Sequence, residues 1–454
     1  MKTVAFLLAT VAAFGANEEA RTDQVFAAFA KPGTPGCAAG VVRDGKVLYS
    51  KGHGFANLEH GMALTPKSSF YLASVSKQFL AFAVLLAEKQ GKLSIDDPVG
   101  RHVEGLPAHT AAVTLRQLLH HTGGVRDYLM LGSLAGLSTD HVWTERAALR
   151  AIARQKALNF APGSEHLYSN SGYVLLSLAL QKAIGGKLDG WMKENVWTPL
   201  GMTNSRWQHD HADPVPARAT GYIGPIGASG WKIGNSMLDT IGDGGMYSSL
   251  EDLLRWAANF DEGKLGASLL DRMSQPVAKE YGMGLARSKY RGLETVAHGG
   301  ALAGYRTMVF RIPARKFTVV CLCNNGSANS STLSQRVADV WLENEFEGAP
   351  PAPVVPEAPK PAKLTTPTAE QRASLAGEWF SAELEATYRI RDLDSKLWLE
   401  AGDSPPVELQ VTEDNKFRPV RIPITLDRRK DTLVLDAGRV RGIEFRPAGA
   451  AGAR

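Results

Sequence analysis

Ser74 and Lys77 have the types and the spacing of a nucleophile and the base that activates it. They stand in the stretch Ser-Val-Ser-Lys, at the start of an apolar run that continues to Leu86. A serine hydroxyl is a poor nucleophile until a neighbouring group removes its proton. Three positions apart at a helix entrance, the two side chains share one face. A lysine acts as a base when neutral, a form that burial favours. The pattern therefore indicates a Ser-Lys acyl-transfer site.

One Ser-x-x-Lys match is weak by itself, because a solvated lysine near an ordinary serine is more common. The chain carries a second copy at Ser229 and Lys232, among glycines and without a helix to hold the geometry. The apolar helix that follows Ser74 is what distinguishes the first copy from the second.

Tyr168-Ser169-Asn170 provides a phenol and an amide for the same chemistry. A phenol keeps its proton at neutral pH and can act as a general base only when nearby cations favour its deprotonated form. Beside Lys77 or His298, Tyr168 could share a proton with them, and Asn170 could hydrogen-bond an amide of the substrate. Alternatively, Asn170 belongs to a loop that caps the next helix. A similar stretch, Tyr247-Ser248-Ser249, occurs later in the chain, and we assign it to helix capping.

His298-Gly299-Gly300-Ala301 precedes a predicted strand. Glycines at a strand edge let a substrate backbone lie against the protein. The N–H groups of Ala301 and Ser74 can then form an oxyanion hole, while His298 faces the substrate or Tyr168. By itself, a histidine before two glycines is more often part of a turn.

His209-Asp210-His211-Ala212-Asp213 has a spacing found in zinc hydrolases. Zinc needs further ligands and groups that orient them, and the sequence offers no obvious source. We therefore interpret this segment as a hydrated surface loop and predict no metal site.

The elements that position these residues follow from hydrophobic patterning. We expect a hairpin over 38–57 with its turn at Asp44-Gly45, an apolar helix over 77–89, and a helical middle section. Strands at 305–312 and 317–323 precede a helix near 333–346. Strands from both ends with helices between them predict an antiparallel sheet flanked by helices.

The C-terminal part has a different pattern. Residues 348–368 are rich in Pro and Ala and predict an extended linker. Beyond it, short alternating runs separated by turn residues predict a small all-β barrel or sandwich. We expect a signal peptide at 1–16, a catalytic domain at 22–347, the linker at 348–368 and the β domain at 369–454.

Composition narrows the functional class. The net charge is +5 over 454 residues, and the basic residues do not cluster, which gives no case for nucleic-acid binding.

The N-terminal segment is typical of a secretory signal, with Lys2, an apolar run at residues 4–14 and small residues after it. The apolar run is too short to span a bilayer. We therefore expect a periplasmic or secreted protein with no transmembrane segment after signal removal. Cys37, Cys321 and Cys323 form no disulfide framework, and we interpret them as structural.

These motifs resemble those of the serine β-lactamase and penicillin-binding-protein superfamily, in the branch of class C β-lactamases, D-aminopeptidases and related esterases. The residues that carry the resemblance are Ser74 to Lys77, Tyr168 to Asn170 and His298 to Gly300, supported by 118–124 and 199–203. The resemblance implies a helical lobe against a five-stranded antiparallel sheet. It implies that Ser74 is acylated, that Lys77 and Tyr168 move protons, and that Ser74 and Ala301 bind the oxyanion.

The resemblance also bears on the substrate. The superfamily's β-lactamases and carboxypeptidases usually carry Lys where His298 stands, whereas His is typical of the aminopeptidase and esterase members. A neutral imidazole attracts a carboxylate less than an ammonium does. We therefore expect a hydrolase of esters or amides, acting on a small-molecule or peptide-like substrate without cofactor. Weak β-lactamase or D,D-peptidase activity is one alternative, and a sensor or scaffold without turnover is another.

Overall fold

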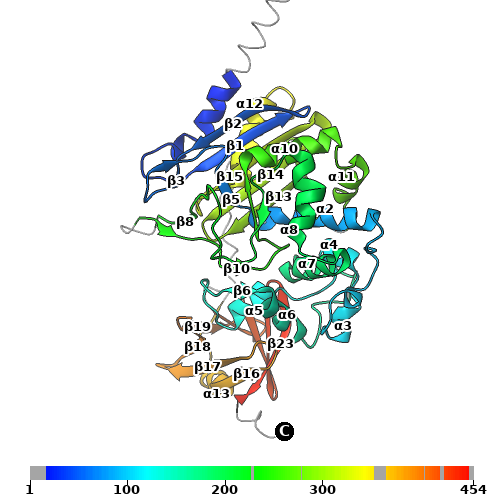
Figure 1. The fold of residues 1–454 in the computed structure, drawn as a ribbon. Coiled ribbons are helices and arrows are strands. Elements are labelled where there is room, and N and C mark those ends of the chain that lie inside the picture. The colour runs from blue at the N-terminus through cyan, green and yellow to red at the C-terminus, as the bar shows by residue number, and fades with distance from the viewer. Residues whose placement is uncertain are drawn as a thin grey trace, which may run out of the picture. The chain divides into compact units, whose positions relative to one another are not determined.

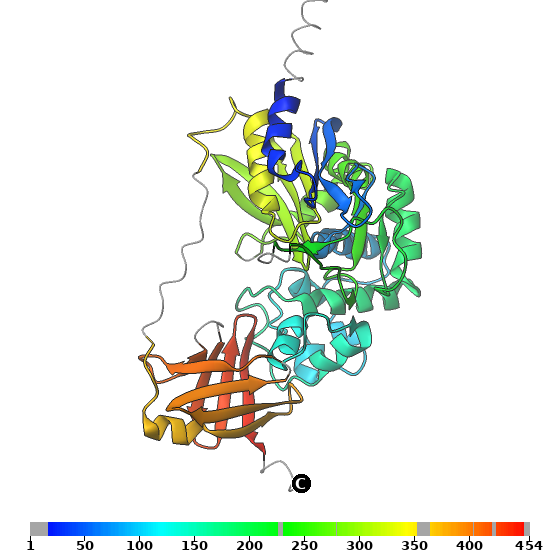
Figure 2. The same cartoon turned by 90° about the vertical axis from the view of Figure 1, so that its left-hand side faces the viewer.

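The computed structural model describes residues 17–225, 230–277, 279–351, 364–402, 404–419 and 424–448. The predicted signal peptide and most of the predicted linker lie outside these ranges. The described chain divides into two compact units (Figures 1 and 2). Unit 1 contains residues 17–95 and 176–351, and unit 2 contains residues 96–175 and 364–448.

Unit 1 is built on a six-stranded antiparallel sheet in the order β12-β13-β14-β15-β1-β2. The predicted hairpin is present, with its turn at Asp44 and Gly45, both in the left-handed region that a tight hairpin turn requires. The resemblance implied five strands, whereas this sheet has six, with β12 and β2 at its edges. The strands are β1 (Cys37–Arg43), β2 (Lys46–His53), β12 (Ala286–Tyr290), β13 (Leu293–Leu302), β14 (Tyr305–Ile312) and β15 (Phe317–Cys323).

Helices cover both faces of this sheet (Figure 1). The helix α12 (Ser330–Trp341) packs on β14 and β15, and α10 (Leu250–Glu262) packs on β1. A Cβ on Gly40 would lie 2.8 Å from a Leu254 methyl, so this glycine permits the close approach of α10. Side chains alternate along β1, and its Ala39 and Val41 join the core with Val337 of α12.

The helix α2 (Ser76–Lys89) runs through the interior of unit 1. It is apolar around its circumference, with every residue from Ser76 to Leu85 buried, which is the pattern of a central helix. Trp256 of α10 fixes it from one side, because the indole Nε1 donates to Gln78 Oε1 at 2.7 Å. The ring of Phe79 lies 4.5 Å from that of Trp256. This packing holds the start of α2, where Ser74 and Lys77 lie.

Shorter elements complete unit 1. A three-stranded sheet has the order β5-β11-β7. The bounds are β3 (Phe55–Asn57), β4 (Met62–Ala63), β5 (Ser69–Tyr71), β7 (Arg206–Trp207), β8 (Tyr222–Ile223), β9 (Lys232–Ile233), β10 (Leu238–Asp239), β11 (Met246–Ser249), α8 (Leu188–Met192), α9 (Thr198–Leu200) and α11 (Ala267–Met273).

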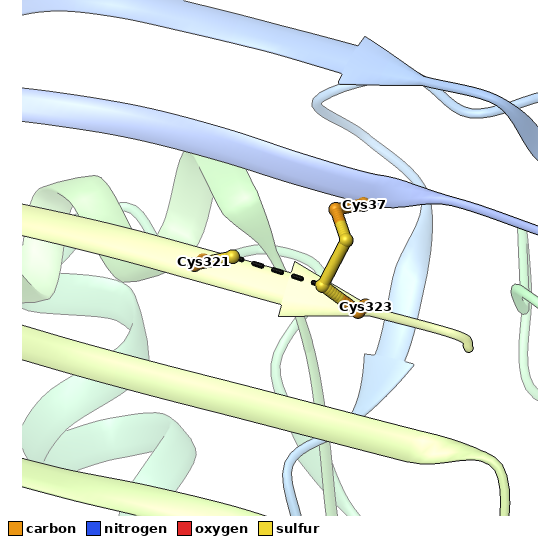
Figure 3. A group of neighbouring side chains, drawn as sticks. All are labelled: Cys37, Cys321 and Cys323. Carbon is orange, nitrogen blue, oxygen red and sulfur yellow. Dashed lines mark hydrogen bonds between the residues drawn. A yellow bond between two sulfur atoms is a disulfide. The ribbon is translucent and has the colours of Figure 1, made fainter. Parts of the chain in front are cut away.

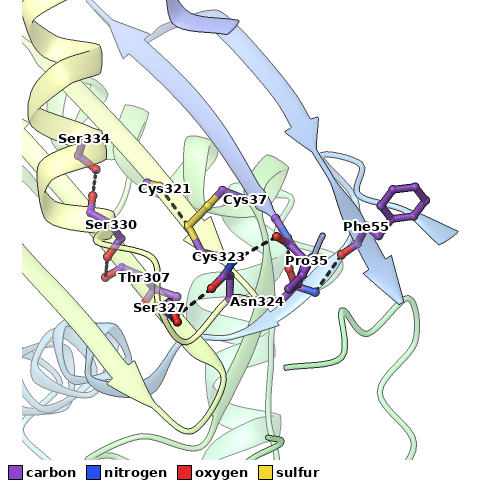
Figure 4. Close-up of a disulfide and its surroundings, with 12 residues drawn as sticks. Pro35, Cys37, Phe55, Thr307, Cys321, Cys323, Asn324, Ser327, Ser330 and Ser334 are labelled. Atoms are coloured by element: carbon purple, nitrogen blue, oxygen red, sulfur yellow. Dashed lines mark hydrogen bonds between the residues drawn. A yellow bond between two sulfur atoms is a disulfide. The ribbon is translucent and has the colours of Figure 1, made fainter. Parts of the chain in front are cut away.

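A disulfide joins Cys37 to Cys323 across β1 and β15, with Cys321 beside it (Figure 3). The two cysteines face each other in the strand register, with Cα atoms 4.0 Å apart. The thiol of Cys321 stays free and buried, 3.7 Å from Cys323 Sγ. Sequence alone did not give this pairing, because it depends on the register of strands 286 positions apart. Next to the bond, the Asn324 amide accepts from Gly36 N–H at 2.8 Å and donates to Phe55 O at 3.0 Å (Figure 4).

The first part of unit 2 is helical. Asp127 caps α5 by accepting the Met130 N–H at 3.0 Å, and Thr144 caps α6 in the same way. The helices are α3 (Ala108–Ala111), α4 (Leu115–Leu119), α5 (Tyr128–Leu134), α6 (Glu145–Ala153), and α7 (Asn170–Ile184), which continues into unit 1; β6 is Trp143–Thr144.

The second part of unit 2 is a closed barrel of eight antiparallel strands, β16 to β23, preceded by α13 (Ala369–Leu375). Inward-facing apolar residues alternate with outward polar ones, as in Tyr388, Ile390 and Leu399. The β domain that the sequence predicts is confirmed. The strands are β16 (Gly377–Ser381), β17 (Ala386–Leu393), β18 (Lys396–Ala401), β19 (Val407–Val411), β20 (Phe417–Pro419), β21 (Ile424–Arg429), β22 (Thr432–Ala437) and β23 (Val440–Pro447).

The barrel packs on the helical part of unit 2 through α5. Leu131 and Leu134 of this helix belong to the apolar core of the barrel. The Tyr388 hydroxyl donates to Leu134 O at 2.7 Å. An ion pair joins Arg126 to Glu383 at 2.6 Å, and both side chains are at most 3% exposed. A buried charge that loses its partner is costly, so this pair ties the two parts together.

The predicted fold class is confirmed, with helices against an antiparallel sheet followed by an all-β barrel. Among the residues described here, no helix has the length and apolarity needed to cross a bilayer.

Candidate active site

The predicted nucleophile and base of unit 1 lie side by side. Ser74 sits in a short 3-10 turn, Ala73–Val75, and Lys77 in the first turn of α2. The Lys77 Nζ lies 3.3 Å from Ser74 Oγ and donates to Asp243 O at 2.5 Å. Lys77 is fully buried, whereas Ser74 is partly exposed. The Asp243 carbonyl fixes the amine, so the hydroxyl of Ser74 is held within reach of it.

The turn that carries Ser74 is strained. Ala73 has a φ of 48°, a left-handed conformation that costs a residue with a Cβ about 1 kcal/mol. Thr307 Oγ1 donates to Leu72 O at 2.8 Å and anchors the turn from β14. Strain of this kind persists where surrounding contacts enforce it, as at many functional sites.

The strand β13 runs directly against this turn. A Cβ on Gly300 would lie 2.2 Å from Leu72 O and 3.2 Å from the Ala73 Cβ, so only glycine allows the approach. Ala301 follows and is exposed. The contact brings the strand segment with Gly299, Gly300 and Ala301 to the residues before Ser74. Their roles in substrate and oxyanion binding stay predictions.

His298 is buried in β13 and held in one tautomer. Its Nδ1 lies 2.7 Å from Gly299 O, and because a carbonyl only accepts, Nδ1 carries the proton. Nε2 then accepts from the Tyr281 hydroxyl at 3.0 Å. Burial, together with the charge of Lys77, lowers the pKa of His298 to about 4. His298 is therefore neutral at pH 7.

Tyr168 and Asn170 lie in unit 2, at the start of α7. Asn170 N–H donates to Asp127 Oδ2 at 2.7 Å, and the Ser171 hydroxyl donates to Arg126 O at 2.6 Å. Asp127 thus fixes the starts of both α5 and α7. The approach of the Tyr168 phenol to the Ser74–Lys77 pair, which joins residues of the two units, stays a prediction.

Two further residues contact the Tyr168 ring. The imidazole of His121 lies 4.3 Å away between ring centroids, and its Nδ1 accepts from Ser169 N–H at 3.2 Å. The guanidinium of Arg439 lies 4.7 Å from the ring centroid. Sequence reasoning missed the contacts of Asp127 with Asn170 and of Arg439 with Tyr168, and it noted His121 only within a supporting stretch.

Comparison with known proteins identifies the family of this chain. The sequence model of the family described as Beta-lactamase matches residues 22–340, more than two thirds of the chain. The chain belongs to the Beta-lactamase family. The resemblance predicted from the motifs is therefore confirmed.

A curated relative is the D-aminopeptidase of Gluconobacter oxydans, which is 30% identical over 332 residues. The match covers 72% of this chain and 62% of the relative. The chain therefore spans less than two thirds of that relative's length.

Two solved structures share the fold. The octameric penicillin-binding protein homologue from Pyrococcus abyssi has a TM-score of 0.60 at 22% identity. The match covers 91% of this chain and 96% of the homologue's chain. The D-amino acid amidase from Ochrobactrum anthropi SV3, complexed with L-phenylalanine amide, has a TM-score of 0.60 at 20% identity. The match covers 71% of this chain and 98% of the amidase chain.

The competing motifs have ordinary surroundings. Ser229 of the second Ser-x-x-Lys copy lies outside the described residues. Tyr247 is a buried strand residue of β11, and the helix capping predicted for this segment comes from Ser249, which accepts the Asp252 N–H. His209 pairs with Asp189, whereas His211 pairs with Asp239, 3.0 Å away. The two histidines of the zinc-like motif therefore hydrogen-bond different carboxylates.

Proposed function

We propose that the protein hydrolyses amides or small esters, with D-aminoacyl amides and peptides as the first class to test, through an acyl-enzyme on Ser74. The contact between Lys77 Nζ and Ser74 Oγ carries this proposal, because it pairs a hydroxyl with a buried amine at 3.3 Å in a Beta-lactamase-family chain. The activity named for the Gluconobacter relative supports the choice of substrate class.

The proposed reaction has two steps. Ser74 Oγ attacks the substrate carbonyl carbon and gives its proton to the Tyr168 oxygen, while the Tyr168 phenol passes its own proton to the Lys77 amine. The N–H groups of Ser74 and Ala301 stabilise the oxyanion. The bond to the leaving amine or alcohol then breaks, and that group takes the proton. Water attacks the acyl carbon in the second step, and Ser74 regains its proton as the acid is released.

The neutral state of His298 supports amides and esters over β-lactams. A lysine at this position would offer a cation to a substrate carboxylate, whereas His298, with its pKa lowered to about 4, does not. In the variant His298→Lys, we expect kcat/KM for a penicillin to rise relative to that for a neutral ester. An unchanged ratio would remove this argument about selectivity.

The experiment compares p-nitroanilides of D-alanine and L-alanine, a p-nitrophenyl ester and a chromogenic β-lactam. Ser74→Ala should abolish turnover of every substrate. Ser76→Ala is the matched control, because Ser76 is fully buried and its Oγ has no hydrogen-bond partner among the described residues. Faster turnover of the β-lactam than of the anilides and esters would favour the β-lactamase alternative. A stable adduct without turnover would favour a sensor.

We further propose export to the periplasm or the medium. The Cys37–Cys323 disulfide supports this, because such bonds persist mainly in oxidising compartments. N-terminal sequencing of the protein from its native source should show cleavage near residue 16. A mature chain that still starts at Met1 would contradict the proposal.

A further inference from the structure

The turn between β22 and β23 of the C-terminal barrel is fixed to the helical part of unit 2. Gly438 takes a positive φ of 45° in this two-residue turn, and Arg439 follows it. The amide of Asn159 holds both sides: Nδ2 donates to Arg439 O at 2.9 Å, and Oδ1 accepts from Arg441 N–H at 2.8 Å. Asn159 is fixed in turn by its own N–H, which donates to Gly124 O at 2.7 Å. The backbone of Arg439 therefore has a defined position.

The Arg439 side chain extends from this turn to the start of α7. Its guanidinium carbon lies 4.7 Å from the Tyr168 ring centroid, and Nη1 lies 3.8 Å from Asp127 Oδ2. The Asp127 carboxylate is 2% exposed, whereas the Arg439 side chain is 42% exposed. The same Asp127 oxygen accepts the Asn170 N–H. A residue of the barrel thus contacts both the predicted proton-transfer group and the carboxylate that holds Asn170.

A guanidinium against an aromatic ring holds the ring and carries a fixed positive charge. The neighbours of Tyr168 within this unit include His121, whose Nδ1 is unprotonated because it accepts from Ser169 N–H. The carboxylate of Asp127 lies 3.8 Å from Arg439 Nη1 and partly balances the charge of the arginine. Among these groups, Arg439 is the permanent cation. A phenol takes part in proton transfer more readily when a cation is close.

We propose that Arg439 is a positioning residue for the reaction, so that the barrel completes the catalytic machinery rather than forming a separate module. Its guanidinium holds the Tyr168 ring and stabilises the negative charge that develops on the phenol oxygen when the proton leaves. This inference rests on the proposed Ser74 acyl-enzyme. The barrel supplies the charge from a position 271 residues beyond Tyr168 in the sequence.

The test compares full-length variants in steady-state turnover of a p-nitrophenyl ester and in the rate at which Ser74 is acylated. We expect Arg439→Ala to lower kcat about tenfold, or about 1.4 kcal/mol at 25 °C, with little change in KM. Arg439→Lys keeps the charge and should recover most of the loss. Arg441→Ala is the matched control. Arg441 is also 42% exposed and lies two residues further on, at the start of β23, but it pairs with Glu165 at 3.0 Å. This variant should stay within about twofold of the parent protein.

A double variant separates action through the phenol from other roles. If Arg439 works through the Tyr168 oxygen, Arg439→Ala should change the residual rate of Tyr168→Phe by less than about twofold. An equal tenfold loss in both backgrounds, a loss confined to KM, or an equal loss in Arg441→Ala would overturn the inference. So would full activity of Arg439→Ala. A parent protein whose Ser74 is never acylated would instead refute the proposed function, and the inference with it.

Discussion

Because His298 is buried in its neutral form, the native protein should lose stability as the pH falls. The pKa of His298 is lowered to about 4 from the ordinary value of 6.5 by burial and by the charge of Lys77. Between these two pH values His298 binds a proton in the unfolded chain but stays neutral in the native protein. The contribution of neutral His298 to the free energy of unfolding is therefore fully present above about pH 6.5 and is lost as the pH falls to about 4. The difference corresponds to about 3 kcal/mol.

The variant His298→Asn isolates this contribution. An asparagine amide can still donate to Gly299 O, as His298 Nδ1 does, but it does not titrate. The assay is urea unfolding of both proteins at pH 7 and pH 4, so that carboxylates common to both cancel. Between these conditions the variant should lose about 3 kcal/mol less free energy of unfolding than the parent protein. Equal losses would refute the conclusion that His298 is held neutral.

Three further outcomes are expected. Tyr168→Phe should slow acylation by a factor on the order of 10² in single-turnover kinetics, and full activity would remove Tyr168 from proton transfer. Glu383→Gln should lower the stability of unit 2 by about 3 kcal/mol in urea unfolding, since it leaves the Arg126 charge buried without its ion-pair partner; unchanged stability would show that the pair does not hold the barrel. Replacing Cys37 and Cys323 together by alanine should lower the free energy of unfolding by about 5 kcal/mol, because the disulfide links residues 286 positions apart, and an unchanged unfolding midpoint would contradict that role.

Local patterns predicted the elements of unit 1 that carry Ser74 and Lys77. The spacing of these residues at a helix entrance is a local signal, and the hairpin of β1 and β2 is encoded by its Asp44-Gly45 turn. The predicted strands at 305–312 and 317–323 match β14 and β15. The edge strand β12 was missed because Ala286–Tyr290 is short and polar.

Contacts between distant segments could not be predicted in this way. Arg439 stands in an ordinary hairpin turn, and nothing near it in the sequence points to Tyr168. The Cys37–Cys323 bond depends on strand register, which spacing along the chain does not reveal. The barrel strand β20, Phe417–Pro419, is too short to show alternation in the sequence. The grouping of residues 96–175 with the barrel rests on side chains such as Leu134 and Glu383, which meet only in the folded chain.

Intact-mass measurement tests the central claim most directly. The protein would be mixed with a D-alanine ester, and the reaction would be quenched in acid within the first turnover. The mass of the intact protein would then be measured by mass spectrometry. We predict a mass increase equal to one acyl group, located on the peptide that contains Ser74, present in Ser76→Ala and absent in Ser74→Ala. Hydrolysis without any adduct on that peptide, or an adduct that persists in Ser74→Ala, would contradict the account.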